Sequence, residues 1–322
     1  MSDLMPLVVP APPQSISANG VVLRHRSRVR RGDKRIKMNV PVIDIHPHII
    51  SDDQQRYPHA PIFGERSEWS RHQSLTIEQL IEAMDEAGVR KAAVVQPSTC
   101  YGYDNSYVAD ATAHHSDRFT GVGAIDMAAP DAEEKIRYWV GRNLSGVRLF
   151  TGGGSTKSFD NNALDDPASF PAWALCTELG LPVCIQTVPS GHAQVAGMAK
   201  RFSGVNIILD HLGRPDVQDG PPYNGARSLF ALSAFENIYL KLTPRGVREA
   251  RKAPASCETF FPKLVSVFGA NRIAWGSNHP ATAGVLKENL YDMKIALSSL
   301  TDSDRDAIFS TTAQKLYPSL RD

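Results

Sequence analysis

The sequence has few cysteines, no long apolar run and almost no net charge. Four of its 322 residues are cysteines and none forms a CxxC pair, so neither a disulfide framework nor a structural zinc site is expected. No apolar stretch approaches the roughly 18 residues of a membrane-spanning helix. A net charge of +1 argues against nucleic-acid binding through overall basicity. With no secretory pattern at the start, these absences predict a cytoplasmic enzyme that acts on a small molecule.

Residues 1–39 differ in composition from the rest of the chain. Prolines interrupt their first part, and the stretch from Arg24 to Lys37 carries eight Lys or Arg against one Asp. We interpret this segment as a basic, solvated N-terminal arm or as a strap between subunits, which would imply a homo-oligomer. Contact with nucleic acid or an anionic surface, and an organelle transit segment, are the alternatives. Residues 40–322, in a chain that is 42% hydrophobic, are predicted to form one domain.

From residue 40 onward, short apolar segments alternate with segments of helical length that carry an apolar stripe. The predicted strands cover residues 40–46, 91–97, 119–126, 146–150, 182–188, 205–211, 238–243 and 272–277. The predicted helices cover residues 76–88, 105–119, 131–143, 167–180, 192–202, 223–235, 256–269, 287–300 and 303–318. Eight strands, each followed by a helix, predict an α/β fold of the (β/α)8 TIM-barrel type. A doubly wound open sheet is the alternative, but no GxGxxG follows the first strand to support a dinucleotide site.

Polar residues are unusually frequent where the predicted strands end, which is where barrel enzymes carry their chemistry. The first strand ends in Asp-Ile-His-Pro-His, and histidines two positions apart, His46 and His48, point the same way from a strand. The sixth strand ends in Leu-Asp-His-Leu-Gly-Arg-Pro, which contains His211. The eighth ends in Trp-Gly-Ser-Asn-His-Pro, which contains Asn278. Each motif alone is a weak signal, and together they predict one active site.

With these three motifs the chain resembles the amidohydrolase superfamily. It is most similar to the amidohydrolase-related branch that holds 2-pyrone-4,6-dicarboxylate lactonase, other lactonases, lactone isomerases and some aromatic-acid decarboxylases. The resemblance runs from about Val42 to about Pro318. It implies that His46 and His48 orient and polarise a carbonyl group and that His211 acts as an acid and base.

The resemblance also implies an anionic substrate. It places carboxylate-binding arginines at Arg148 and Arg214, while Lys241 and Arg245 after the seventh strand offer similar groups. Arginine suits this task because its guanidinium is planar, permanently charged and bidentate. Further predicted substrate contacts are Gln186, Tyr101 and Tyr103, although the two tyrosines could equally pack within their loop.

Two positions depart from the family pattern. Asn278 stands where the family usually has an Asp that ligates metal or takes a proton from water, and an amide has negligible basicity. Gln186 stands where many metal-dependent members have His or Lys. A metal site would therefore rest on His46, His48 and His211, and three histidines can bind zinc. The expectation is either no cofactor or one divalent metal such as zinc.

We therefore predict a hydrolase that opens the cyclic ester of a small carboxylated lactone. With Asp absent, the base for water would be His211, His48 or His279, and Asn278 would hold water or a substrate hydroxyl. A lactone isomerase is the first alternative, because isomerisation needs no activated water. A metal-dependent aromatic-acid decarboxylase and a catalytically degenerate barrel that binds a small acid are the others. The polar segment 51–73 is expected to lie over the barrel mouth.

Overall fold

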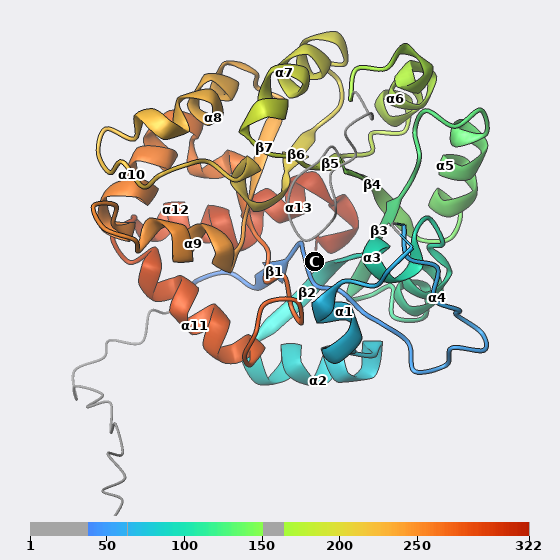
Figure 1. Cartoon of the computed structure of the whole chain (residues 1–322). Coiled ribbons are helices and arrows are strands. Elements are labelled where there is room, and N and C mark those ends of the chain that lie inside the picture. The colour runs from blue at the N-terminus through green and yellow to red at the C-terminus, as the bar shows by residue number, and fades with distance from the viewer. Residues whose placement is uncertain (1–37, 63, 151–163, 322) are drawn as a thin grey trace, which may run out of the picture. The chain divides into compact units, whose positions relative to one another are not determined.

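The computed structural model describes residues 38–62, 64–150 and 164–321. Eight parallel strands follow one another in chain order around a barrel (Figure 1). They are β1 (Val42–Asp44), β2 (Val89–Val95), β3 (Phe119–Ala124), β4 (Leu144–Phe150), β5 (Val183–Gln186), β6 (Ile207–Leu209), β7 (Ile238–Leu242) and β8 (Ile273–Trp275). The backbone N–H of Ile45 donates to the carbonyl of Trp275 at 3.1 Å and so links the last strand to the first. The predicted (β/α)8 barrel is confirmed. Residues 1–37 of the predicted arm lie outside the described residues.

Helices surround the barrel (Figure 1). The longer ones are α2 (Ile77–Ala87), α4 (Ser106–His114), α5 (Ala132–Val140), α6 (Phe170–Glu178), α7 (His192–Arg201), α10 (Cys257–Phe268) and α11 (Leu286–Ala296). Short helices are α1 (Glu68–His72), α3 (Ser98–Tyr101), α8 (Arg227–Ala231), α9 (Pro244–Ala250), α12 (Asp302–Asp306) and α13 (Thr312–Leu316). None of the described helices is long and apolar enough to cross a membrane.

Helix α2 illustrates how the sequence sets these elements. The Thr76 hydroxyl accepts from the backbone N–H of Gln79, whose side chain accepts from the backbone N–H of Thr76, which makes a capping box. The helix ends at Gly88, whose φ of 74° lies in the left-handed region that glycine tolerates best. The face of the helix that carries Leu80 and Met84 is buried.

Apolar side chains also fill the inside of the barrel. Ile43, Val95, Val122 and Ile208 from the strands belong to one buried cluster with Tyr317 and other residues around α13. The Thr312 hydroxyl donates to the carbonyl of Ala270, just before β8 begins, at 3.3 Å. The C-terminal segment therefore fills the end of the barrel where the strands begin, and leaves the other end for polar groups. All four cysteines are buried free thiols.

A cluster of buried charges lies above this apolar core. Asp210, directly after β6, is fully buried, and its two oxygens pair with Nζ of Lys241 and Nε of Arg148, both at 2.8 Å. His46 Nδ1 lies 3.7 Å from the same carboxylate. Burial alone would raise the pKa of Asp210, but the charges of Lys241 and then Arg148 outweigh it and hold that pKa well below its usual range.

Replacing Asp210 by Asn would leave Lys241 and Arg148 buried beside a neutral amide. We expect Asp210→Asn to lower the free energy of unfolding by about 3–5 kcal/mol in urea denaturation, because breaking one side of a buried ion pair leaves an uncompensated charge. Asp292→Asn is the matched control, since it removes the carboxylate of an exposed pair with Arg251. That change should cost under about 1 kcal/mol.

The depressed pKa of Asp210 gives this prediction a pH dependence. The ion pairs stabilise the fold fully above the ordinary carboxyl pKa of about 3.9 and lose their effect as the pH falls toward the folded-state pKa. The stability gap between the wild type and Asp210→Asn should therefore narrow below about pH 4. Should the variant fail to fold, adding Lys241→Met removes one orphaned cation and is expected to restore part of the stability. Equal costs at the buried and exposed sites would contradict this account.

Candidate active site

The histidine pair lies just beyond β1, because the strand is shorter than predicted and ends at Asp44. Asp44 fixes the chain that follows, since its Oδ1 accepts from the backbone N–H groups of His46 at 2.9 Å and Ser277 at 2.8 Å. Burial raises the pKa of Asp44 to about 6. A side chain at Gly276 would place its Cβ 2.5 Å from that of His46. The rings of His46 and His48 are in edge-on contact, with their centroids 4.9 Å apart.

His211 and Arg214 lie in a strained turn after β6. Their φ angles of 56° and 54° fall in the left-handed region, which costs an L-residue roughly 1–2 kcal/mol. His192 holds the turn, because its Nε2 donates to the carbonyl of Gly213 at 3.0 Å. The turn places the His211 ring 5.2 Å from the ring of His46. Strain of this kind tends to occur at functional sites, where the surrounding structure maintains it.

One cavity at the carboxyl ends of the strands collects most of the predicted site residues. Its lining comprises His48, Trp69, Pro97, Ser98, Thr99, Arg148, Phe150, Gln186, His211, Arg214, Arg245, Arg248, Asn278 and Ala281. Four of these residues are arginines, and the described lining contains neither Asp nor Glu. Arg148 shares the carboxylate of Asp210 and donates to Gln186 Oε1 at 2.9 Å. The Asn278 side chain donates to the hydroxyl of Thr282 at 3.1 Å.

Three arginines of the cavity lining lack a direct acidic partner. Arg214, Arg245 and Arg248 form no ion pair within the ranges that the structure describes, and Nε of Arg214 is buried without a hydrogen-bond partner. Burial, and then the charge of Arg245, lowers the pKa of Arg214 to about 10. The cavity therefore carries an excess of positive charge.

Burial and nearby cations, chiefly Arg148 and Lys241, keep the histidines neutral. Burial, followed by the charge of Arg148, lowers the pKa of His48 to about 3. Burial also lowers the pKa of His211 to about 3, against the opposite pull of Asp210. The pKa of His46 lies well below its usual value because of burial and then Lys241. All three rings are therefore neutral imidazoles near neutral pH, each with one N–H.

Their hydrogen bonds differ in kind. His48 Nδ1 faces the backbone carbonyl of Val95 at 2.7 Å, while His211 Nδ1 faces the hydroxyl of Thr243 at 2.8 Å. Both ring nitrogens of His46 are buried without a hydrogen-bond partner in the described structure. His46 is fully buried and stands behind the cavity wall rather than in it.

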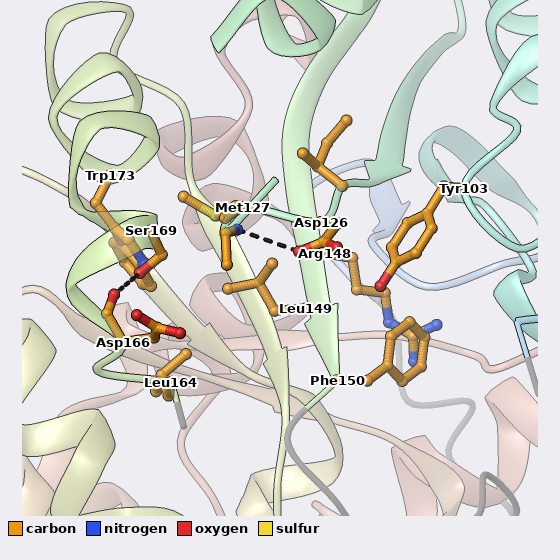
Figure 2. Close-up of a pocket in the computed structure, with 12 residues that line it drawn as sticks. Tyr103, Asp126, Met127, Arg148, Leu149, Phe150, Leu164, Asp166, Ser169 and Trp173 are labelled. Carbon is orange, nitrogen blue, oxygen red and sulfur yellow. Dashed lines mark hydrogen bonds between the residues drawn. The ribbon is translucent and has the colours of Figure 1, made fainter. Parts of the chain in front are cut away.

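Three of the predicted substrate contacts lie elsewhere. Lys241 is fully buried beneath the cavity, where it pairs with Asp210. Tyr101 is buried in its loop, and its hydroxyl accepts from the backbone N–H of Ser51 at 2.8 Å. Tyr103 lines a neighbouring cavity, and Figure 2 shows it beside Arg148, which with Phe150 lines both cavities.

Sequence reasoning missed Asp210, Trp69 and Arg248. Asp210 precedes His211 directly, so its place at a strand end was a usable signal. Trp69 comes from α1, and its ring stacks on His48 with centroids 5.2 Å apart at 27°. The segment expected over the mouth does therefore reach the cavity. Arg248 lies one helical turn beyond Arg245 on α9.

The histidines do not fit a divalent metal as they are arranged. Within the described parts of the chain, no three His, Cys, Asp or Glu side chains are placed to hold a metal ion. The carboxylate of Asp210 is taken by two cations, and Lys241 and Arg148 lie close enough to His46 and His48 to suppress their protonation. The same positive field opposes a dication.

Comparisons with known proteins agree with this architecture. A stretch of 199 residues, 61% of this chain and 67% of the relative, is 25% identical to an L-fucono-1,5-lactonase from Burkholderia ambifaria. Another of 206 residues, 63% of this chain and 66% of the relative, is 23% identical to a 4-sulfomuconolactone hydrolase from Rhizobium radiobacter. A solved structure from Pseudomonas putida, provisionally named a 2-pyrone-4,6-dicarboxylic acid hydrolase, shares the fold over 88% of this chain and 100% of its own, with a TM-score of 0.69 and 20% identity. The amidohydrolase family itself matches residues 43–319, and the chain belongs to that family.

Proposed function

We propose that the protein hydrolyses the cyclic ester of a small lactone that carries at least one carboxylate. The observation that carries this proposal is the cavity at the strand ends, where neutral histidines stand among four arginines with no acidic side chain in the described lining. Two relatives named for their action on lactones support the reaction type.

The excess charge supports an acidic substrate. Arg214 is half-buried with an unpartnered Nε, so a carboxylate placed there would regain a charge-assisted hydrogen bond at little further desolvation cost. Arg245 and Arg248 are exposed beside it and would draw the anion toward the cavity. The histidines behind these arginines provide groups that can move a proton at the ester.

Loss of the Arg214 guanidinium should discriminate between substrates. We expect Arg214→Ala to raise KM for a carboxylated lactone by about 10- to 100-fold, the equivalent of one charge-assisted hydrogen bond, and to change KM for the neutral parent lactone little. Steady-state kinetics on the matched pair of lactones measures this. Arg227→Ala, at an exposed arginine on α8, is the control. Equal effects on both substrates would refute a carboxylate contact at Arg214.

Labelled water should distinguish hydrolysis from isomerisation. Hydrolysis forms a bond between water and the ring carbonyl carbon, so we expect mass spectrometry to find one ¹⁸O atom in the new carboxylate. A lactone isomerase would transfer the acyl group to a substrate hydroxyl and leave the product unlabelled. Isomerisation is a serious alternative because Asn278 is an amide, so no carboxylate stands at that position to activate water. Product incubated with the enzyme in labelled water controls for exchange.

The reaction should also proceed without a metal ion. We expect untagged protein, purified without chelator, to carry far less than one zinc or manganese per chain by mass spectrometry, because the positive field at Lys241 and Arg148 disfavours a dication. Turnover should survive dialysis against chelator. One metal per chain, with activity lost on its removal and regained on its return, would contradict this and bring metal-dependent decarboxylation back into consideration.

A further inference from the structure

His48 has a fixed tautomer. Its Nδ1 lies 2.7 Å from the carbonyl oxygen of Val95, and a carbonyl oxygen can only accept a hydrogen bond. Nδ1 must therefore carry the proton. Because the ring is neutral, Nε2 carries a lone pair and no hydrogen. A neutral His48 can thus accept a proton or a hydrogen bond at the cavity, but it cannot donate one to a substrate carbonyl.

The ring is also held in place on several sides. Trp69 stacks on one face with centroids 5.2 Å apart, and the edge of His46 meets it at 4.9 Å and 76°. The backbone N–H of His48 donates to the carbonyl of His279 at 2.7 Å. Because Nδ1 is hydrogen-bonded to the carbonyl of Val95, Nε2 is the ring nitrogen left for the cavity that His48 lines.

No other polar group in the described lining of this cavity is fixed in this state. His211 faces a threonine hydroxyl, which can donate or accept, so His211 can present a proton at Nε2 and serve as a donor. His46 lies behind the cavity wall. Asn278 lines the cavity but has no basicity, and Lys241 is buried in its pair with Asp210.

We propose that Nε2 of His48 is the general base that activates water, in place of the carboxylate that position 278 lacks. This rests on the proposed lactone hydrolysis. A bond forms between the water oxygen and the ring carbonyl carbon while the water proton passes to Nε2, and the carbonyl electron pair moves onto its oxygen. When that pair returns, the bond between the carbonyl carbon and the ring oxygen breaks. The ring oxygen takes the proton back from His48, and the product is a hydroxy acid.

The arginines explain how this base is kept free and then used. After burial, the charge of Arg148 does most to lower the pKa of His48, so Nε2 is free of a proton before substrate arrives. A substrate carboxylate near Arg148 would offset that charge and make Nε2 more basic in the complex. Trp69 would act as a positioning residue, because its ring stacks on that of His48.

The tautomer can be tested without any substrate. Protein labelled with ¹⁵N-histidine, with the His48 signals assigned by their loss in His48→Asn, should show a protonated Nδ1 and an unprotonated Nε2 near neutral pH. An Nε2–H tautomer or an imidazolium would overturn the proposal even if a lactone is hydrolysed. A wild type with the Nδ1–H tautomer that opens no carboxylated lactone would refute the proposed function instead.

Kinetics then tests the role. His48→Asn keeps an amide N–H for Val95 and removes the base, so we expect kcat to fall by about 10²- to 10⁴-fold with KM little changed. Adding Asn278→Asp restores a carboxylate at the mouth and should recover at least about tenfold in kcat. His72→Asn, at an exposed histidine of α1, is the control for the substitution itself.

Three outcomes are informative. Recovery in the double variant supports a missing base, because neither a lost carbonyl donor nor lost packing is replaced by a carboxylate at position 278. A fall in kcat that Asn278→Asp leaves unchanged, or a rise in KM alone, would overturn the assignment. Trp69→Phe should retain most of kcat and Trp69→Ala should lose it without a matching change in KM, as expected for a positioning residue.

Discussion

Asp210 stands between two cations inside the barrel, at a depth where a charge without a partner costs several kcal/mol. Its carboxylate balances Lys241 and shares Arg148, so it has no capacity left for the arginines at the mouth. Those arginines form no ion pair within the described residues, and burial together with Lys241 and Arg148 holds the histidines neutral. The stability of the barrel interior and the chemistry of the cavity thus depend on the same carboxylate.

The features that the sequence predicted well are the local ones. Alternation of apolar and helical segments is enough for eight strands and their helices, and the His46–His48 pair lies within one short motif. Lys241 shows a limit of such predictions, because a position near the end of a strand does not determine how deeply its side chain is buried. β7 ends at Leu242, and Lys241 points inward to Asp210 rather than up to the mouth. The place of Trp69 in the cavity could not be predicted either, because it depends on how segment 51–73 folds back over the barrel and no local sequence pattern encodes that.

The histidines show a second limit of the sequence. His48 and His211 are the same residue type and occupy the same cavity, yet their capacities differ through the atom that each Nδ1 contacts. A backbone carbonyl fixes the proton on His48, whereas the hydroxyl of Thr243 leaves His211 free to hold it on either nitrogen. The sequence alone could not predict this difference, because Val95 lies 47 residues away from His48 in the chain and only the fold brings them together. The distinction matters for the proposed reaction, because position 278 offers an amide in place of a carboxylate and a ring nitrogen would then have to serve as the base.

Substrate binding and proton transfer meet at Arg148. Its guanidinium belongs to the cavity that would hold a carboxylate, and its charge lowers the pKa of His48. An anion beside Arg148 therefore gains an ion pair and at the same time relieves the field that weakens the base. A neutral lactone would enter the same cavity and find His48 less basic. Selectivity for acids would then arise partly in the chemical step, because the group that recognises the substrate also controls the residue that acts on it.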